Sequence, residues 1–473
     1  MRQNPSFRDR CGAVLAAVAL ITSVIACAGD STITTAVSPP ARPPETPTAS
    51  PNVIVILAEA LGWSGTSVQL DAAVATSRHR FLTTPAIARL AANGMRFSQF
   101  YAPSPRCTPS RAAFFSGRSP AQLKMTFVGE AAEQGSPNAP LITPVAVEQL
   151  PTTLPTVASL LKSAGYATAH FGKWHVGRAD PSLHGFDVSD GPTANGGPDN
   201  VAHPNPAQSY ATVARAMTFI TQQVGAKRPF FVQLSQYAGK EALDVKPETW
   251  AAAKAQMPGQ SDAAVGFAAT TLEFDNTLAL LWARLDSLGV TDNTYIFLWS
   301  DHGPQGNTAD LPLSLGKGTV WEGGVRVPLL VAGPGIPRGS STTVRATGVD
   351  LLPTILDLVG KPVSGVTGLE GGSLKTVLQG NGTGIVTRPR SEFVVHFPHY
   401  DFDPIGPAST IYAGNFKLIR AYTDGALRLF DLSTDLGERT DLSRANPAKT
   451  AELDGLLSAY LTQQGAQMPT RRP

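Results

Sequence analysis

Cysteine is scarce in this sequence, and neither sign of charge is in excess. Three cysteines occur in 473 residues, which is too few for a disulfide framework. The first 26 residues hold three arginines and one aspartate of the chain's 38 basic and 36 acidic residues, so 35 of each sign remain after them. Because proteins that bind nucleic acid usually carry a basic excess, this balance argues against nucleic acid as the main partner.

Long apolar runs are also scarce, and the one near the N-terminus is short. CGAVLAAVALITSVIA, residues 11–26, follows the basic stretch MRQNPSFRDR and is shorter than the roughly 20 residues that span a membrane. The pattern predicts a secretory leader over residues 1–26. Its end, Val24 to Cys27, resembles a bacterial lipobox. This resemblance implies a lipid on Cys27 and an exported protein anchored to a bacterial membrane, in the periplasm or at the cell surface. A plain leader cleaved near Ala28 is the alternative.

The rest of the chain divides into three parts by its composition. Residues 27–51 are rich in Pro, Thr, Ser and Ala, which predicts a tether. Residues 52–375 alternate apolar runs of strand length with longer amphipathic segments, which predicts an α/β domain with a large, mostly parallel sheet flanked by helices. Residues 376–473 have shorter runs separated by turns, which predicts a small antiparallel sheet with a closing helix. The runs of the large sheet are NVIVIL (52–57), YATAHFG (166–172), PFFVQLSQ (229–236), TYIFLWS (294–300) and VPLLVAG (327–333).

Polar side chains follow three of the predicted strands at the point where each strand ends. Glu59 comes after the first run, Lys173 and His175 after the second, and Asp301 and His302 after the fourth. One such group alone is more often a turn or a helix cap than a ligand. Because ligands bind outside the carboxyl ends of the strands in open α/β sheets, the repetition favours a functional site there.

Cys107 lies in the stretch CTPSR, at the predicted start of a helix. Pro109 suits the first turn of a helix, and Arg111 with the positive helix end would favour an anion. A buried structural cysteine is the ordinary reading of an isolated thiol. The proline and arginine around it favour a functional thiol instead.

These residues resemble the signature of a known family. Cys-x-Pro-Ser-Arg followed by Ser116-Gly117-Arg118 is similar to the signature of the type I, formylglycine-dependent sulfatases, which are arylsulfatase-like members of the alkaline-phosphatase-like superfamily. The resemblance extends over nearly the whole chain after residue 51. It includes NVIVILAEALGWSG, TLPTVASLLKSAGYATAHFGKWHVG, SDHGP, GKGTVWEGGVRVPLLVAGPG, VHFPHY and LRLFDLSTDLGERTDLS, in the family's order.

The resemblance implies a nucleophile and an activity. Cys107 would be oxidised to formylglycine by a formylglycine-generating enzyme, and the hydrated aldehyde would attack the sulfur of a sulfate monoester of a carbohydrate or aryl alcohol. Arg111 would hold the hydrate, Lys173 and His175 would contact its hydroxyls, and His175 would act as the base. Lys317 would bind the substrate sulfate and assist the leaving oxygen.

The same resemblance implies one divalent cation, Ca²⁺ or Mg²⁺. Its ligands would be Glu59, the matured residue 107, Asp301 and His302. Relatives normally carry two adjacent aspartates after the first strand, whereas this chain has Glu59 and Ala60, so one anionic ligand is missing. Calcium usually takes 6 to 8 oxygen ligands, so the loss should weaken the site unless water or another residue fills the gap.

A second departure follows the third strand. Relatives have Pro-His there, whereas this chain has Gly239-Lys240, and Lys240 could still supply positive charge to a sulfate oxygen. Two other functions remain open: a catalytically impaired lipoprotein of sulfatase fold that binds an anionic glycan, and a hydrolase of phosphate or phosphonate esters. His396 and His399 in VHFPHY either line the substrate pocket or pack at the domain junction.

Overall fold

The computed structural model describes residues 50–129, 138–195, 208–237, 245–305, 311–361, 363 and 365–473. The predicted leader, Cys27 and nearly all of the tether lie outside these residues, and so does Lys240. Within the described ranges, no helix combines the length and the apolar character that a membrane crossing needs.

The larger of the two main sheets has eight strands, in the order β10-β2-β9-β8-β1-β7-β5-β6. Strands β6, β5, β7, β1 and β8 are parallel, β9 runs antiparallel to both β8 and β2, and β10 pairs in parallel with β2. The sheet is therefore mostly parallel, as the sequence predicts. The bounds are β1 Asn52–Leu57, β2 Gly94–Phe97, β5 Ala167–Gly172, β6 Val188–Ser189, β7 Phe230–Ser235, β8 Thr294–Trp299, β9 Leu329–Ala332 and β10 Ser340–Thr342.

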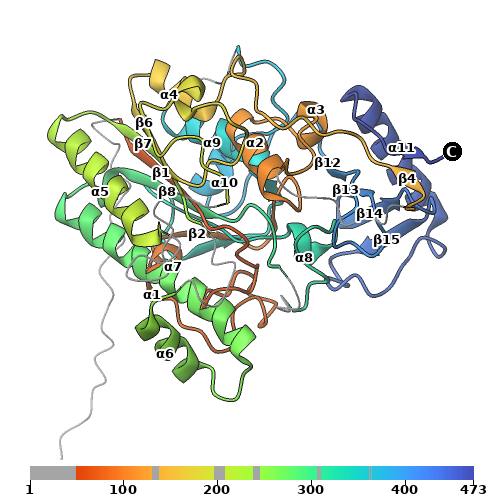
Figure 1. Cartoon of the computed structure of the whole chain (residues 1–473), viewed down its shortest axis with the longest axis horizontal. Helices are drawn as coiled ribbons and strands as arrows, with labels where there is room; N and C mark the ends of the chain where they lie inside the picture. The colour runs from red at the N-terminus through yellow and green to blue at the C-terminus, as the bar shows by residue number, and fades with distance from the viewer. Residues whose placement is uncertain are drawn as a thin grey trace, which may run out of the picture. The chain divides into compact units, whose positions relative to one another are not determined.

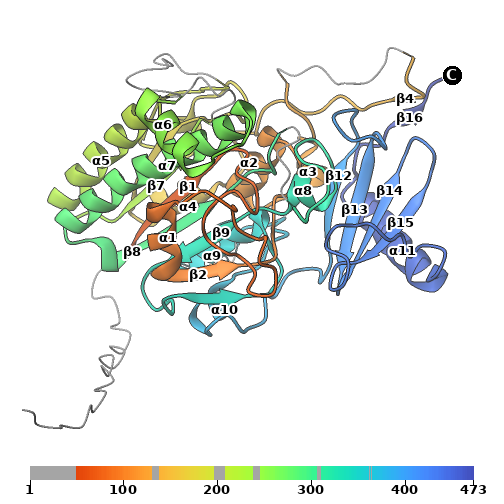
Figure 2. The same cartoon turned by 90° about the horizontal axis from the view of Figure 1, so that it is seen from below.

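Helices cover both faces of this sheet. All six residues of β1 are buried, and alternate side chains point to opposite faces, as the period of a strand requires. On one face pack α2 (Cys107–Ser116), α4 (Val157–Ser163), α9 (Leu351–Leu358) and α10 (Lys375–Gln379). On the other pack α1 (Pro85–Ala92), α5 (Ser209–Gly225) and α7 (Asp262–Ser287). Figure 2 shows α5 and α7 on one side of the strands and α9 and α10 on the other.

The antiparallel direction of β9 has a consequence for the site. The segment between β8 and β9 begins at the carboxyl end of β8 and re-enters the sheet at β9 from the same edge. It carries Asp301, His302 and Lys317, so these residues stay near that edge. The sequence alone does not indicate the direction of β9, nor that β2 and β10 extend the sheet beyond it.

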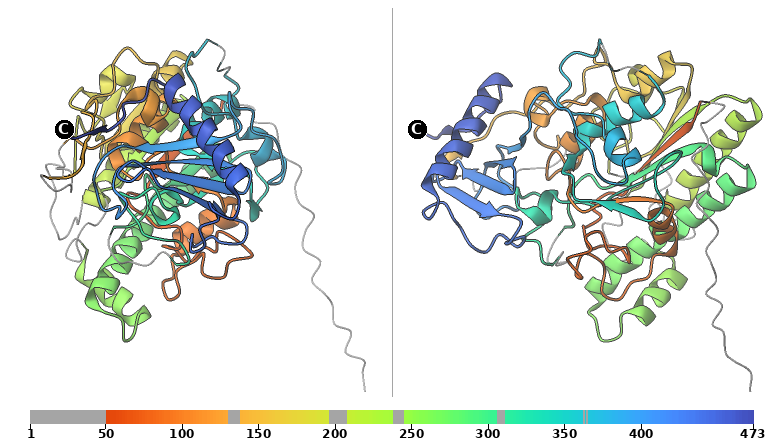
Figure 3. Two further views of the ribbon diagram at one scale, coloured as in Figure 1. Left: turned by 90° about the vertical axis from the view of Figure 1, so that its right-hand side faces the viewer. Right: turned by 180° about the vertical axis from the view of Figure 1, so that it is seen from behind.

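The C-terminal part forms the predicted antiparallel sheet with a helix. Strands β12 (Phe393–Phe397), β13 (Ala408–Ala413), β14 (Phe416–Ala421) and β15 (Leu427–Asp431) pair in chain order. Helix α11 (Pro447–Gln463) packs across one face of this sheet through Leu453, Leu457 and Leu461 (Figure 3, left). In Figure 1, α3 (Pro120–Leu123) and α8 (Glu322–Val325) lie between the two sheets.

A buried charge network joins the small sheet to the segment that follows Lys317. Lys417 Nζ on β14 lies 3.1 Å from Glu322 Oε1 and 2.7 Å from Glu438 Oε1, and all three side chains are fully buried. Tyr101 and Tyr412 donate hydrogen bonds to the Glu322 carboxylate at 2.9 and 3.0 Å. Burial opposes ionisation of Glu322, but Lys417, Arg326 and the hydrogen bonds together outweigh it and hold the Glu322 pKa below its usual value. The network therefore fixes the start of α8 against the C-terminal sheet.

Candidate active site

Three parallel strands bring the predicted polar residues to one edge of the sheet. Strand β1 ends before Glu59, β5 before Lys173 and β8 before Asp301, and β1 is hydrogen-bonded directly to β8. Lys173 Nζ lies 2.6 Å from Glu59 Oε1, and Asp301 Oδ1 lies 3.6 Å from His302 Nε2. Parallel strands place their carboxyl ends together, which is why residues more than 100 positions apart meet here.

Cys107 faces this edge from the first residue of α2. Its side chain is buried, with Sγ 3.1 Å from His302 Nε2 and 3.6 Å from Glu59 Oε1. The imidazole of His175 is also hydrogen-bonded to the Cys107 side chain. Cys107 thus lies at the positive end of a ten-residue helix, where an anionic form is favoured.

Two buried cations hold the carboxylates of the site. Arg111 Nε donates to Asp301 Oδ2 at 3.0 Å, and its Nη1 donates to the backbone oxygen of Lys173 at 2.6 Å. Lys173 Nζ donates to Glu59 Oε1 at 2.6 Å and to Asn195 Oδ1 at 2.8 Å. Arg111 is one helical turn after Cys107, so both residues lie on the same face of α2.

The pKa shifts follow from this crowding of charges. Burial opposes ionisation of the Cys107 thiol, but Lys173, Lys317 and His302 outweigh it, so the thiol pKa falls well below its usual value. Burial likewise opposes ionisation of Glu59, yet Lys173 lowers the Glu59 pKa to about 2, with smaller help from Arg111 and Lys317. The site is therefore built to hold negative charge on residues 59 and 107.

The donor set fits a divalent cation. One ligand atom each from Glu59, Cys107 and His302 lie within 4.8 Å of one another. The thiol stands here for the oxygen of the formylglycine that the resemblance to the family implies at residue 107. Glu59 Oε2 is buried, is 3.8 Å from Arg111 Nη2, and accepts no hydrogen bond from any described residue. A carboxylate oxygen left open in this way can take a cation, with Asp301 as a further oxygen ligand.

Ala60 occupies the place where the resemblance to the family implies a second aspartate. Its backbone is in the left-handed region, with φ of 57°, and its N–H donates to Asp301 Oδ1 at 3.3 Å. The residue therefore reaches the site through its backbone, and its methyl side chain offers no ligand. Asp and Asn adopt this backbone region more readily than other non-glycine residues, so the conformation itself suits a carboxylate there.

Lys317 lies on a buried loop whose charge acts on Cys107. The residue is 8% exposed, and its positive charge lowers the pKa values of both Cys107 and Glu59. The backbone N–H of Lys317 donates to Pro304 at 2.8 Å, and that of Gly318 donates to Pro105 at 3.0 Å. The loop is thus attached to the residues that precede Cys107.

The two histidines of VHFPHY are buried and hydrogen-bonded within the C-terminal part and at its junction. His396 pairs with Ser409 Oγ at 2.6 Å and with the backbone oxygen of Gln467 at 2.9 Å. His399 Nε2 lies 2.8 Å from Thr126 Oγ1. These contacts favour the packing interpretation of both histidines.

Three residues near the site are not indicated by the sequence. Asn195 accepts from Lys173, and Arg106, the residue before the nucleophile, forms two hydrogen bonds to the buried carboxylate of Asp401. Asn195 and Asp401 each lie far from their partners in the chain, so no local pattern reveals these pairs. The positive charge of Arg106 directly before the CTPSR stretch is the local signal that could have drawn attention to Arg106.

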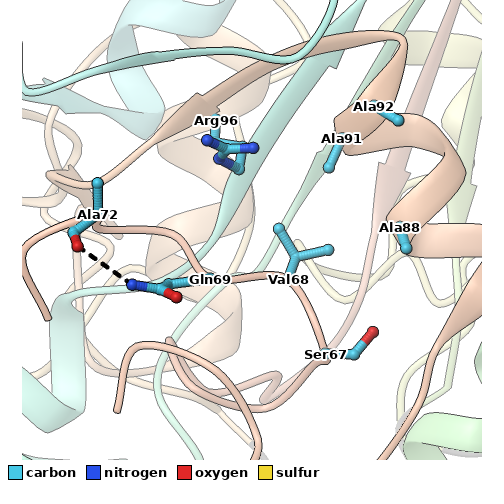
Figure 4. A pocket seen from close by; sticks show the side chains of 8 residues that line it. All are labelled: Ser67, Val68, Gln69, Ala72, Ala88, Ala91, Ala92 and Arg96. Atoms are coloured by element: carbon cyan, nitrogen blue, oxygen red, sulfur yellow. Dashed lines mark hydrogen bonds between the residues drawn. The ribbon is translucent and has the colours of Figure 1, made fainter. Parts of the chain in front are cut away.

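Two other pockets lie away from Cys107. One of about 460 Å³ is lined by residues of the 67–72 loop, of α1 and its C-terminal end, and by Arg96 of β2 (Figure 4). A larger one of about 720 Å³ lies between the C-terminal helix and the loops near residues 119 and 370, with Tyr460 and Arg390 in its wall. Neither pocket is lined by a predicted site residue.

A buried cysteine at a helix start, with carboxylates and cations at the carboxyl edge of a mostly parallel sheet, is an arrangement that suits a hydrolase, and the comparisons identify the family as one of the alkaline-phosphatase-like superfamily. Residues 51–361 match the family described as Sulfatase, so the chain belongs to the sulfatase family. Human arylsulfatase A is 28% identical, over 85% of this chain and 85% of that protein. A sulfatase of Formosa agariphila is 28% identical, over 88% of this chain and 89% of that protein.

Solved structures support the same fold. The crystal structure of Ps i-CgsB in complex with k-i-k-neocarrahexaose aligns with a TM-score of 0.72 and 24% identity, over 87% of this chain and 93% of that one. A protein in complex with its substrate D-glucosamine-2-N, 6-O-disulfate aligns with a TM-score of 0.66 and 20% identity, over 88% and 98%. Family membership supports sulfate ester hydrolysis as the activity.

Proposed function

We propose that this protein hydrolyses sulfate monoesters of a carbohydrate or aryl alcohol through a formylglycine made from Cys107. The observation that carries the proposal is the position of Cys107: a buried thiol of lowered pKa at a helix start, surrounded by Lys173, His175 and Lys317. A structural cysteine has no need of three basic neighbours. Solved relatives contain a neocarrahexaose and a disulfated glucosamine, which supports a sulfated carbohydrate as the substrate class.

The residues present divide the chemistry among themselves. When residue 107 is matured and a divalent cation is held by Glu59, Asp301 and His302, the hydrated aldehyde supplies a hydroxyl nucleophile and the cation supplies positive charge beside it. Arg111 keeps Asp301 in place through its Nε–Oδ2 hydrogen bond. Lys173 fixes Glu59, and its charge also acts on residue 107.

Proton transfer falls to His175 and Lys317. The His175 imidazole is hydrogen-bonded to the side chain of residue 107, so it is within reach of a proton on that residue. Lys317 Nζ carries a positive charge that suits an oxygen of the ester, including the oxygen that leaves. Lys240 is proposed as a further cation for the sulfate.

We also propose export and a lipid anchor on Cys27, which would place the enzyme at a bacterial membrane.

The test begins with the maturation of Cys107. The protein is produced with and without a formylglycine-generating enzyme, and trypsin, which cleaves after Arg106 and Arg111, releases the short peptide that begins at Cys107. We expect the aldehyde only in the co-produced protein, and aryl sulfate hydrolysis only there. Cys107→Ala is the control for background hydrolysis.

The outcomes separate the three candidate functions. An unmodified thiol, beside a control sulfatase that matures in the same cells, would contradict the proposal and favour a protein that binds anionic glycans. A matured protein that hydrolyses aryl phosphonates much faster than aryl sulfates would make it a phosphonate ester hydrolase. Mass spectrometry of the protein isolated from membranes tests the lipid on Cys27.

A further inference from the structure

The residue before the nucleophile is tied to the C-terminal subdomain. Arg106 is the N-cap of α2, and its Nε and Nη2 donate to the two oxygens of Asp401, 295 positions later in the chain. The Asp401 side chain is fully buried and that of Arg106 is 10% exposed. A bidentate pair of this kind fixes orientation as well as distance, because the guanidinium is planar.

The guanidinium of Arg106 is also held by aromatic rings. It lies 5.6 Å from the ring centre of Phe127 and 5.3 Å from that of Phe402. With both oxygens of Asp401 bound to it, its charge is neutralised at short range. Arg106 is therefore poorly suited to bind a substrate anion, and its role must lie in what it holds.

Asp401 also lies against the loop that carries Lys317. Gly318 has a φ of 77°, and a Cβ at this position would come within 2.4 Å of Asp401 Oδ2. The absence of a side chain at Gly318 lets the loop pass directly over the Asp401 carboxylate. The same glycine donates its N–H to Pro105 at 3.0 Å. One carboxylate thus contacts the neighbour of the nucleophile and the neighbour of Lys317.

Asp403 holds the far side of the same loop. Its carboxylate accepts from the backbone N–H of Val320 at 3.1 Å and from Trp321 Nε1 at 3.2 Å. The turn that contains Asp401 and Asp403 therefore contacts the chain after Lys317 at Gly318, Val320 and Trp321. Main-chain contacts of this kind restrict where the Lys317 side chain can begin.

We propose that Asp401 and Arg106 form a positioning clamp that sets the place of Lys317 relative to residue 107. The inference rests on the proposed function, because Lys317 matters only if it acts on the ester. Neither clamp residue touches the reacting atoms. Both act through Lys317, so their loss should affect the step in which Lys317 takes part more than the binding of the rest of the substrate.

The test uses the full, matured chain with Asp401→Asn and Arg106→Lys. Asp401→Asn removes the charge of the pair, whereas Arg106→Lys keeps the charge but loses the bidentate geometry. The control is Arg388→Gln, because Arg388 forms an equally bidentate buried pair with Asp350, with Nη2–Oδ2 of 2.7 Å, and bonds otherwise to the backbone oxygen of Arg345 rather than to a described residue of the Lys317 loop. Each variant is assayed with aryl sulfates that differ in the pKa of the leaving alcohol.

We expect kcat to fall about 10- to 100-fold in Asp401→Asn, with KM changed less than about threefold. The loss should grow as the leaving alcohol becomes less acidic, since Lys317 then has more to contribute. Arg106→Lys should lie between wild type and Asp401→Asn. Arg388→Gln should be no more sensitive to the leaving group than wild type. A uniform loss across all leaving groups, or equal losses in Arg388→Gln, would overturn the clamp.

Hydrogen exchange separates this proposal from the proposed function. Exchange of the backbone amides of residues 316–320 should be faster in Asp401→Asn and Arg106→Lys than in wild type, and unchanged in Arg388→Gln. If the matured wild type hydrolyses no sulfate ester, the proposed function fails, and this exchange still decides the clamp. Wild-type exchange in both clamp variants would refute it.

Discussion

Replacing Ala60 by aspartate should lower the unfolding free energy of the metal-free protein and should tighten metal binding. The substitution supplies the carboxylate that the resemblance to the family implies there. Ala60 has a φ of 57°, a backbone region that aspartate tolerates better than most residues, so the change adds little strain. Its effect should therefore come from the charge.

The magnitude follows from the neighbouring carboxylates. The Ala60 N–H lies 3.3 Å from Asp301 Oδ1. A new carboxylate on residue 60 would thus lie roughly 5 Å from that of Asp301, where repulsion at an effective dielectric constant of about 20 is about 3 kcal/mol. Arg111 and Lys173 already pair with Asp301 and Glu59, and Lys317 already acts on the ionised Cys107, so each of these three cations faces an anion before a further carboxylate is added. We expect the metal-free variant to lose about 2–3 kcal/mol of unfolding free energy.

A bound divalent cation should reverse this loss. Tightening of metal binding by at least about tenfold, equivalent to about 1.4 kcal/mol, is expected from one more anionic ligand. The assay is urea unfolding with a chelator and in a series of Ca²⁺ and Mg²⁺ concentrations, together with calorimetric titration of the metal. Ala60→Asn is the matched control, because it adds an oxygen of the same shape without charge. Equal metal-free stability and equal metal affinity in Ala60→Asp and wild type would refute the reasoning.

Two further predictions concern buried ionisable groups. Lys417→Met should cost about 3–5 kcal/mol of unfolding free energy at neutral pH, because it leaves the buried carboxylates of Glu322 and Glu438 without their shared cation. Urea unfolding measures this loss, and a loss below about 1 kcal/mol would contradict the role of the network. Burial and the charge of Arg111 lower the His170 pKa from 6.5 to about 3, so the folded protein keeps this ring neutral while the unfolded chain takes up a proton. The contribution of the neutral His170 ring to the unfolding free energy is then fully present above about pH 6.5. It is lost as the pH falls toward 3, by about 2–3 kcal/mol at pH 4.5. His170→Phe should remove this loss, and unchanged acid sensitivity in that variant would contradict it.

The sequence predicts the strands and the edge where the site lies because both depend on local signals. Apolar runs of strand length such as 52–57 and 294–300 match β1 and β8 in the structure to within one residue. Since parallel strands end at the same edge, the positions of Glu59, Lys173 and Asp301 in the fold follow from their positions after those runs. The signature around Cys107 adds the identity of the family.

What the sequence does not predict depends on contacts between distant segments. Strand β9 is antiparallel to β8 because the segment that joins them leaves and re-enters the sheet at the same edge. An apolar run in the sequence does not indicate whether its strand is parallel or antiparallel to its neighbours. Arg106 precedes α2 and Asp401 lies between β12 and β13, so neither carries a local signal that names the other. The geometry of Lys317 relative to residue 107 is likewise a product of the junction with the C-terminal sheet.

The charge balance of the site explains why Ala60 is compatible with a stable fold. Glu59, Asp301 and an ionised Cys107 face Arg111, Lys173 and Lys317, so three buried anions meet three cations before any metal enters. A cation that binds here competes with Arg111 and Lys173 for the same carboxylates, and it adds positive charge to a site that is already balanced. A fourth anion at position 60 would tighten metal binding and lower the stability of the metal-free protein. Alanine at this position gives weaker metal binding and a more stable metal-free protein. The residue at position 60 therefore sets how strongly the folded site depends on its metal.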